Sequence, residues 1–273
     1  MLFLVVINNL FYRLGCEMQM INILLSGCNG KMGQVITRLS DNFSGLKIVA
    51  GFDINNNISN PYPVFTSLND CNVKVDVIID FSNPKAFYGL TEYAQEKRIP
   101  IVVATTGLSP EQTSTLKNDV SKRIPVFFSA NMSLGVNLLI DLVKKAAKVL
   151  EGQFDIEIIE KHHNQKIDAP SGTALAIADA INTSLDEKCE YTYDRHSRRK
   201  KRSKQEIGIH AVRGGTIVGD HSVIFAGNDE IIEINHTATS KEIFGVGALK
   251  ASMFLASKQP GLYSMTDLIA EIN

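Results

Sequence analysis

The first half of the chain alternates short apolar runs, rich in Val and Ile, with longer stretches whose apolar residues recur at helical spacing. The runs predict strands, and the stretches between them predict helices. The predicted strands are 21–26, 46–53, 75–81, 101–104 and 126–129, and the predicted helices are 31–43, 84–98 and 109–123. Buried strands joined by crossover helices are typical of a parallel sheet covered on both faces, so this half predicts a doubly wound α/β domain.

The pattern changes after a long predicted helix at 133–150. Alternating apolar and polar residues then predict strands at 154–163, 207–213, 222–226 and 230–238, with one helix, 172–185, among them. Strands that follow one another predict a mixed or antiparallel sheet, and hence a second, smaller α+β domain. The chain becomes helical again at 240–256 and from 265 to its end, and this tail can return to the first domain.

Residues 1–19 stand apart from this pattern. Residues 1–12 are largely apolar, but Asn8 and Asn9 interrupt them, and the run is shorter than the roughly 20 residues that cross a bilayer. A basic leader and a small-x-small cleavage site are both missing, which disfavours a secretory signal. Met20 opens the first predicted strand, so we expect either that translation starts at Met20 or that residues 1–19 are a dispensable extension.

Charge and cysteine content narrow the classes of function. The chain carries 28 Lys and Arg against 29 Asp and Glu, so no overall field favours nucleic acid or an anionic membrane. Four cysteines lie far apart without a C-x-x-C pair, which disfavours a disulfide framework or a zinc site and is typical of the reducing cytoplasm. Residues 195–204 hold seven basic residues, which we interpret as a solvated loop. The alternatives are contact with an acidic ligand or with nucleic acid, although no aromatic residues interleave the charges.

A glycine-rich loop follows the first predicted strand. Gly27, Gly30 and Gly33 give the spacing G-x-x-G-x-x-G directly before a predicted helix. Asn29 stands where the common dinucleotide-binding motif has its second glycine, a mild departure because Asn tolerates left-handed geometry. Free N–H groups at such a helix start suit a pyrophosphate, although a plain turn remains the alternative.

Asp53 ends the second predicted strand, where an acid would bind the ribose hydroxyls. The alternative is a simple turn residue. The next residue is Ile54 rather than a basic residue that could hold a 2′-phosphate, so the sequence favours NADH over NADPH.

The most informative stretch is 160–174, E-K-H-H-N-Q-K-I-D-A-P-S-G-T-A. His162 and His163 are adjacent, so they can share a pocket only if their strand ends there. Lys166 adds a compact charge that can also donate a proton, and His162 can exchange protons near neutral pH. Ser171 is a good N-cap, and the N–H groups behind it could receive a carboxylate. A surface histidine and an ordinary helix start are the alternatives for each piece alone, and the spacing is poor for zinc.

This stretch resembles the signature of the dihydrodipicolinate reductase family, E-x-H-H-x-x-K-x-D-A-P-S-G-T-A. Nearly everything from Met20 to Asn273 is similar to that family. Supporting pieces are the loop at 27–33 and the segments D-F-S (80–82), T-T-G (105–107), N-M-S (131–133), R-G-G (213–215), V-G-D-H (218–221) and G-A (247–248).

The resemblance implies a Rossmann-type cofactor domain, residues 20–132 with 242–273, and a mixed-sheet substrate domain, residues 133–241, through which the protein forms a homotetramer. It also implies reduction of 4-hydroxy-tetrahydrodipicolinate by NADH or NADPH, without a metal. His162 would be the general acid/base and Lys166 the proton donor, while His163, Gly172 and Thr173 would bind substrate. The implied cofactor contacts are Gly27, Cys28, Asn29, Gly30, Lys31, Met32, Asp53, Ala104, Thr105, Thr106, Ser129, Ala130, Asn131 and Met132.

Two positions depart from the family pattern. Ala104 stands where the family often has Gly, and Lys241 stands where Arg is usual, which keeps the charge but loses a bidentate grip on a carboxylate. Another Rossmann dehydrogenase of a small amino or hydroxy acid would share the 27–33 loop but not the 160–174 stretch. A non-catalytic nucleotide-sensing or nucleic-acid-binding protein is the alternative from a different class.

Overall fold

The computed structural model describes residues 20–197 and 199–272, so the prediction for residues 1–19 lies outside the described part. The chain divides into two compact units. The first ends at Ala130 and takes up Ala248–Ser264 again, and the second comprises Asn131–Gly247 and the C-terminal residues from Met265.

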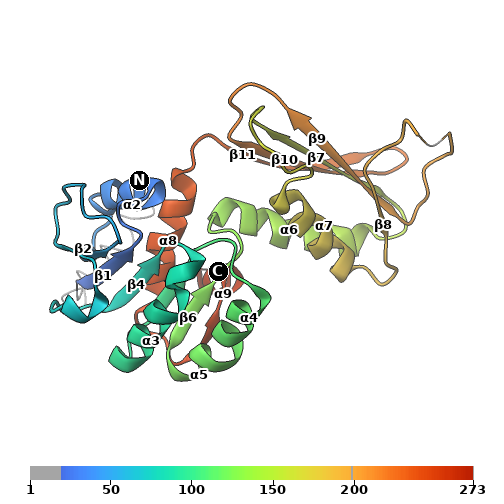
Figure 1. The fold of residues 1–273 in the computed structure, drawn as a ribbon. Helices are drawn as coiled ribbons and strands as arrows, with labels where there is room; N and C mark the ends of the chain where they lie inside the picture. The colour runs from blue at the N-terminus through green and yellow to red at the C-terminus, as the bar shows by residue number, and fades with distance from the viewer. Residues whose placement is uncertain (1–19, 198, 273) are drawn as a thin grey trace. The chain divides into compact units, whose positions relative to one another are not determined.

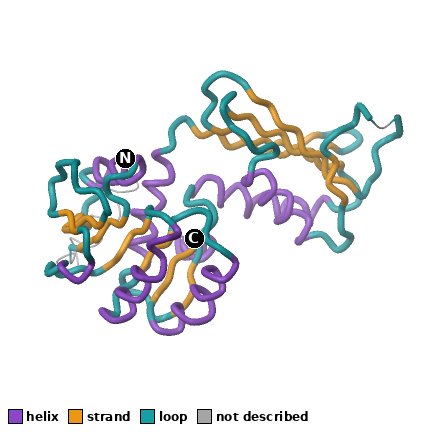
Figure 2. The backbone as a smooth tube through the Cα atoms, viewed as in Figure 1, coloured by secondary structure: helices purple, strands orange, loops and turns teal. Residues whose placement is uncertain are grey.

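The first unit is built on a parallel sheet of seven strands in the order β12-β6-β5-β4-β1-β2-β3 (Figures 1 and 2). The strands are β1 (Ile21–Ser26), β2 (Leu46–Phe52), β3 (Val64–Phe65), β4 (Val77–Asp80), β5 (Ile101–Val103), β6 (Pro125–Phe128) and β12 (Gly261–Tyr263). The main helices are α2 (Lys31–Ser40), α3 (Phe87–Lys97), α4 (Pro110–Thr115), α5 (Ser121–Arg123) and α8 (Glu242–Leu255), whose last eight residues belong to this unit. The predicted doubly wound parallel sheet is confirmed.

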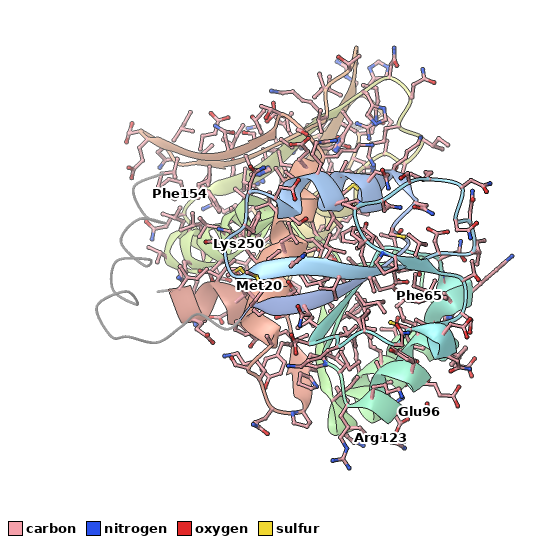
Figure 3. All side chains as sticks on the ribbon, turned by 90° about the vertical axis from the view of Figure 1, so that its left-hand side faces the viewer. Met20, Phe65, Glu96, Arg123, Phe154 and Lys250 are labelled. Atoms are coloured by element: carbon pink, nitrogen blue, oxygen red, sulfur yellow. The ribbon has the colours of Figure 1, made fainter. Side chains whose placement is uncertain are left out.

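Apolar strands with little polar alternation explain this sheet. All four residues of β4 are buried, and Ile23, Leu24 and Leu25 of β1 are completely inaccessible. Both faces of the central strands therefore need a cover, which crossover helices provide. Glu96 and Arg123 lie near helix ends at the outer rim of the side-chain packing (Figure 3).

The second unit contains a five-stranded mixed sheet in the order β11-β10-β7-β9-β8. Its strands are β7 (Asp155–His162), β8 (Glu190–Thr192), β9 (Glu206–Arg213), β10 (Gly219–Ala226) and β11 (Ile231–Ala238). β7 is antiparallel to β10 and parallel to β9. α6 (Leu134–Leu150) and α7 (Gly172–Ser184) cover one face (Figure 1), and the residues of β7 are alternately buried and partly exposed as a sheet covered on one face requires.

Several element boundaries differ from the predictions. The strands β3, β8 and β12 have only two or three residues, too few to show a pattern. The predicted helix at 109–123 contains a π-helical segment, Leu116–Val120, between α4 and α5. β10 begins at Gly219 rather than at residue 222, which adds Asp220 and His221 to the strand.

The C-terminal tail divides between the two units, which differs from the predicted boundary. β12 pairs with β6 in the first sheet, whereas α9 (Met265–Ile272) packs against α6 in the second unit. Met265 and Leu268 of α9 are buried. None of the helices within the described residues combines the length and apolar character that crossing a bilayer requires.

Candidate active site

The glycines of the loop after β1 would let its backbone approach a ligand closely. Gly27 has a φ of 76°, and a Cβ there would come within 2.5 Å of the Phe81 carbonyl oxygen. A Cβ on Gly33 would collide with the Gly27 carbonyl oxygen. α2 starts at Lys31 behind Gly30, and no side chain caps this described helix start. The loop therefore fits a pyrophosphate bound by backbone N–H groups.

Asp53 joins the end of β2 to this loop. Its Oδ2 accepts a hydrogen bond from the Asn29 N–H at 3.0 Å, and its Oδ1 accepts one from the Asn55 N–H at 3.1 Å. Asp53 therefore closes a turn, as the alternative interpretation held, and also holds its carboxylate beside the glycine loop. Both functions are compatible because each oxygen keeps a further lone pair.

Other predicted cofactor residues follow neighbouring strands. Ala104, Thr105 and Thr106 come after β5, and Ser129 and Ala130 after β6. The carboxyl ends of parallel strands share one edge of the sheet, so these segments lie at the same edge as the glycine loop. Asn131 and Met132, by contrast, belong to the second unit.

A buried carboxylate supports this edge. Asp80 accepts hydrogen bonds from the hydroxyls of Ser82 at 2.5 Å and Thr105 at 2.8 Å, so it ties the loops after β4 and β5 together. Burial raises the pKa of Asp80, although these hydrogen bonds act in the opposite direction. In the neighbouring loop, burial and the charge of Asp53 raise the pKa of Cys28 to about 11, which keeps the thiol protonated and disfavours a nucleophilic role.

The second unit contains a cavity of about 660 Å³, counted with its opening to solvent. Among the residues that line it, those with polar or titratable side chains are Asn131, His162, His163, Lys166, Thr173, His221, His236 and Lys241. β7 ends at His162, so the backbone turns there and both neighbouring histidines reach the same cavity.

Sheet register explains why distant residues meet here. His236, His221 and Glu160 are cross-strand partners on β11, β10 and β7, and His162 is paired with Arg213 of β9. Residues two apart on a strand share a face, so Glu160 and His162 both point to the face covered by helices.

His162 is anchored by Glu160. Its Nδ1 lies 2.6 Å from Glu160 Oε2, and the Glu160 side chain is completely buried. Arg213 donates to both carboxylate oxygens at 2.7 Å, and the Ser171 N–H donates to Oε1 at 2.9 Å. Gly219 leaves room for the imidazole, since a Cβ there would lie 3.2 Å from His162 Nε2.

Lys166 and the start of α7 complete one side of the cavity. Lys166 Nζ pairs with Asp168 Oδ1 at 2.9 Å, and the Asp168 side chain is exposed. Ser171 caps α7, as predicted, by accepting a hydrogen bond from the Ala174 N–H. Thr173 lines the cavity and its hydroxyl accepts a hydrogen bond from Asn131 Nδ2 at 3.2 Å. Gly172, also predicted to bind substrate, is not among the described residues that line it.

The sequence interpretation gave no role to several residues of this site. Ser171 Oγ contacts His221 Nε2 at 3.2 Å, and the rings of His162 and His221 pack edge to face with centroids 5.2 Å apart. Burial and the nearby His162 lower the pKa of His221 to about 4, so it is neutral at physiological pH. Burial also lowers the pKa of His236. His221 and Arg213 lay in the V-G-D-H and R-G-G segments that supported the family resemblance, which was the available signal.

Two family profiles together match most of the described chain. Residues 21–132 match the profile described as "Dihydrodipicolinate reductase, N-terminus", and residues 135–269 match "Dihydrodipicolinate reductase, C-terminus". The chain belongs to the dihydrodipicolinate reductase family. The resemblance read from residues 160–174 is thereby confirmed.

Individual relatives agree with the family. The chain is 56% identical over 250 residues to the 4-hydroxy-tetrahydrodipicolinate reductase of Caldanaerobacter subterraneus subsp. tengcongensis, covering 92% of this chain and 98% of that protein. It is 52% identical over 246 residues to the protein of the same name from Clostridium tetani, covering 90% and 96%. The solved structure of a dipicolinate-bound dihydrodipicolinate reductase from Paenisporosarcina sp. TG-14 covers 90% of this chain and 98% of that chain, at 25% identity and a TM-score of 0.76.

Family membership assigns the first unit as a nucleotide-binding Rossmann domain, consistent with the loop geometry around Gly27 and Asp53. Within the described part of the chain, no group of three or more His, Cys, Asp or Glu residues could hold a metal ion.

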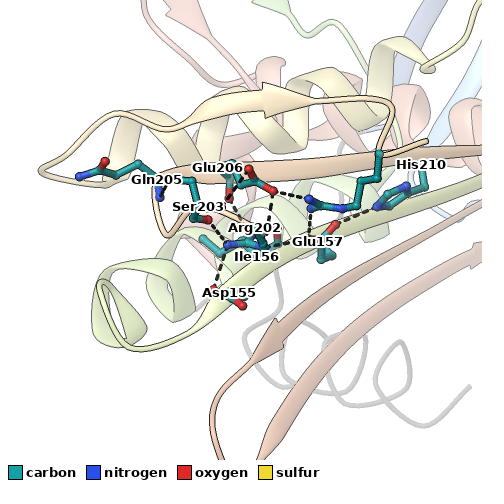
Figure 4. Close-up of polar contacts among 9 residues, drawn as sticks. Asp155, Ile156, Glu157, Arg202, Ser203, Gln205, Glu206 and His210 are labelled. Atoms are coloured by element: carbon teal, nitrogen blue, oxygen red, sulfur yellow. Dashed lines mark hydrogen bonds and ion pairs between the residues drawn. The ribbon is translucent and has the colours of Figure 1, made fainter. Parts of the chain in front are cut away.

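Two arginines of the basic segment, residues 195–204, form ion pairs that the prediction of a solvated loop did not include. Arg202 donates to Glu157 Oε1 and Asp155 Oδ1, both at 2.9 Å, and its side chain is only 17% exposed (Figure 4). Arg195 pairs with Glu157 and Glu206. The prediction is therefore wrong for Arg202, because the open face of the sheet presents carboxylates that the sequence pattern did not connect with it. Arg195 is paired as well, but its side chain is 39% exposed.

Proposed function

We propose that this protein reduces (2S,4S)-4-hydroxy-2,3,4,5-tetrahydrodipicolinate to (S)-2,3,4,5-tetrahydrodipicolinate with NADH or NADPH, a step of diaminopimelate and lysine biosynthesis. The observation that carries the proposal is the cavity of the second unit. Its lining combines two lysines and a hydroxyl with a histidine held by a buried carboxylate. The chain matches relatives named for this activity over nearly their whole length, which supports the same assignment.

The cationic side chains around the cavity suit a substrate with two carboxylates. Lys166, Lys241 and His163 can face carboxylate oxygens, and Thr173 adds a hydroxyl at the start of α7. The positive end of that helix favours an anion as well. The related Paenisporosarcina enzyme was solved with dipicolinate, a planar ring with two carboxylates, which supports this class of ligand.

Proton transfer is the chemical task of this chain's own residues. When bound, the reduced nicotinamide supplies the hydride that enters the substrate ring at its 4-position after water is lost. His162 then donates a proton to the resulting enamine, and Lys166 is the second proton source. Two anchored carboxylates hold the ring in position, so a large part of the rate comes from orientation.

The residues at the strand ends of the first unit would hold the cofactor. The N–H groups at the start of α2 would bind the pyrophosphate, and Asp53 would accept hydrogen bonds from the ribose hydroxyls. Ile54 is 92% exposed and offers no cation to a 2′-phosphate, so we favour NADH as the preferred cofactor.

The remaining features of the proposal concern assembly and location. The face of the mixed sheet opposite α6 and α7 exposes Val212 and Ile231, the latter 69% accessible. Exposed apolar residues on a sheet face support contact between copies, and we propose a cytoplasmic homotetramer joined through the second unit.

The decisive assay follows NADH and NADPH oxidation in parallel with freshly generated 4-hydroxy-tetrahydrodipicolinate. We expect turnover with both nucleotides and a higher kcat/KM with NADH. A Lys166→Ala variant should lose about 10²-fold or more in kcat/KM, since a carboxylate contact and a proton donor disappear together. Oxidation of neither nucleotide, at any substrate concentration, would reject the proposal, and a hydroxy-acid or amino-acid substrate tested alongside identifies a different dehydrogenase.

A further inference from the structure

The proposed proton transfer assigns no role to Glu160. Its carboxylate is nevertheless buried and fully hydrogen-bonded. Its two oxygens accept four hydrogen bonds, from both terminal nitrogens of Arg213, from the Ser171 N–H and from His162 Nδ1. We infer that Glu160, clamped by Arg213, is a positioning residue that fixes His162 as the Nδ1–H tautomer with Nε2 available at the cavity.

The charge state of Glu160 determines the direction of the contact with His162. Burial alone would raise the pKa of Glu160, but the hydrogen bonds from Arg213, His162 and the Ser171 N–H outweigh it and hold the pKa below its ordinary value. An ionised carboxylate can only accept hydrogen bonds. His162 Nδ1 therefore carries the proton in the 2.6 Å contact, and Nε2 is the nitrogen that can exchange a proton with a ligand.

Arg213 fixes the orientation of the carboxylate. Its guanidinium binds both Glu160 oxygens, and it also donates to the carbonyl oxygens of Val212 and Asp168. A bidentate pair sets the plane of the carboxylate, so the oxygen facing His162 cannot rotate away without breaking charge-assisted bonds. The Asp168 contact also links this clamp to the turn that carries Lys166.

Other titratable groups surround His162, and the test has to separate their effects. His221 packs against the His162 ring from β10. The other titratable groups around the cavity are His163, Lys166, His236 and Lys241. Glu160 is the one carboxylate in hydrogen-bond contact with the ring among the described residues, so removing it changes the tautomer preference directly.

The test is a nitrogen NMR measurement on the full-length protein with ¹⁵N-labelled histidine. The chain has six histidines, so the His162 signals are assigned from their loss in His162→Gln. In the wild type near pH 8 we expect a protonated Nδ1 and an unprotonated Nε2. A wild-type spectrum with the proton on Nε2 overturns the inference without any further variant.

Glu160→Gln sharpens the measurement. Oε1 accepts from two fixed donors, the Ser171 N–H and Arg213 Nη2, whereas Oε2 accepts from only one besides His162, which is Arg213 Nη1. The amide oxygen should therefore stay at the Oε1 position, and the amide NH₂ should face His162. Nδ1 must then accept, and the tautomer should switch to Nε2–H. Glu157→Gln is the matched control, because Glu157 also lies on β7 and binds two arginines and His210 of β9, but on the opposite face of the sheet. An unchanged tautomer in Glu160→Gln overturns the inference.

Steady-state kinetics test whether Glu160 affects catalysis. This expectation rests on the proposed function. In Glu160→Gln we expect kcat to fall about 10²-fold or more, with KM changed far less. The amide NH₂ that then faces Nδ1 disfavours the doubly protonated imidazolium from which Nε2 donates its proton. Glu160→Asp, which keeps the charge, should retain the Nδ1–H tautomer and recover part of kcat.

The two hypotheses fail in different ways. If the wild type oxidises neither nucleotide with the dicarboxylate but the tautomer switches in Glu160→Gln, the proposed function is rejected and the positioning role stands. If the enzyme is active and Glu160→Gln retains the Nδ1–H tautomer of His162, the positioning role is rejected and the function stands.

Discussion

β7 carries two clusters of similar composition on its two faces. On the face covered by helices, Glu160 binds Arg213 and His162. On the open face, Glu157 binds Arg202 and Arg195 and also accepts a hydrogen bond from His210 Nε2 at 2.8 Å (Figure 4). Residues three apart on a strand point to opposite faces, so the same kinds of side chain meet in two different environments.

Burial separates the two clusters. The Glu160 side chain is completely buried and depends on a single arginine, whereas the Glu157 side chain is 21% exposed and has two. Only the first cluster contributes a residue, His162, to the lining of the cavity in the second unit. A carboxylate, an arginine and a histidine in contact therefore do not by themselves define a catalytic site. In the proposed function, the cavity beside His162 is what distinguishes the two clusters.

The largest expected difference between the clusters is catalytic. His162→Gln should lower kcat by about 10²–10⁴-fold, the usual contribution of a positioned general acid. His210→Gln, the corresponding change on the open face, should stay within about twofold of the wild type. Steady-state kinetics with the hydroxy-dicarboxylate and NADH measure both. Near-full activity of His162→Gln would remove this residue from the mechanism.

The second difference concerns stability. Arg213→Met leaves the fully buried Glu160 without its arginine and should lower the free energy of unfolding by about 3–5 kcal/mol. Arg202→Met should cost about 1–2 kcal/mol, because Arg195 continues to neutralise Glu157 and Glu206. Urea unfolding followed by circular dichroism compares the variants, since the chain has no Trp for fluorescence. Equal losses would show that burial does not distinguish the clusters.

Periodicity predicted the architecture well because it depends on local sequence. Strands buried on both faces read as continuous apolar runs, and β7 showed the alternation of a sheet covered on one side. Short strands such as β12, and the packing of α9 on α6, depend on contacts with segments far away in the chain. No window around residues 261–272 contains that information.

The candidate site was predictable in its parts but not in its connections. His162 and Lys166 belong to a compact motif, and both line the cavity. Arg213 and His221 reach His162 only through the register of β9 and β10 with β7. A one-residue shift in either register would turn these side chains to the open face, and the sequence alone does not specify register between distant strands.

The smallest expected difference appears in the response to acid. The pKa values of Glu157 and Glu160 both lie below the ordinary value of 4.5: burial acts to raise each, and the hydrogen bonds from arginine and histidine outweigh it. A carboxyl group with a lowered folded-state pKa stabilises the protein fully above its unfolded value. That stabilisation is lost as the pH falls below about 4.5 and through the folded-state pKa.

Salt should distinguish the two contributions to this acid response. Raising NaCl from about 0.1 M to 1 M shortens the screening length from about 10 Å to about 3 Å, which weakens exposed pairs more than buried ones. We expect Glu157→Gln to reduce the loss of stability between about pH 5 and pH 3 by no more than about 1 kcal/mol, and only at low salt. Glu160→Gln should flatten the same part of the curve at both salt concentrations, because water and ions do not reach its carboxylate. Urea midpoints measured at each pH and salt concentration test this expectation. If the contribution of Glu160 also changed with salt, its carboxylate would not be shielded from ions by burial.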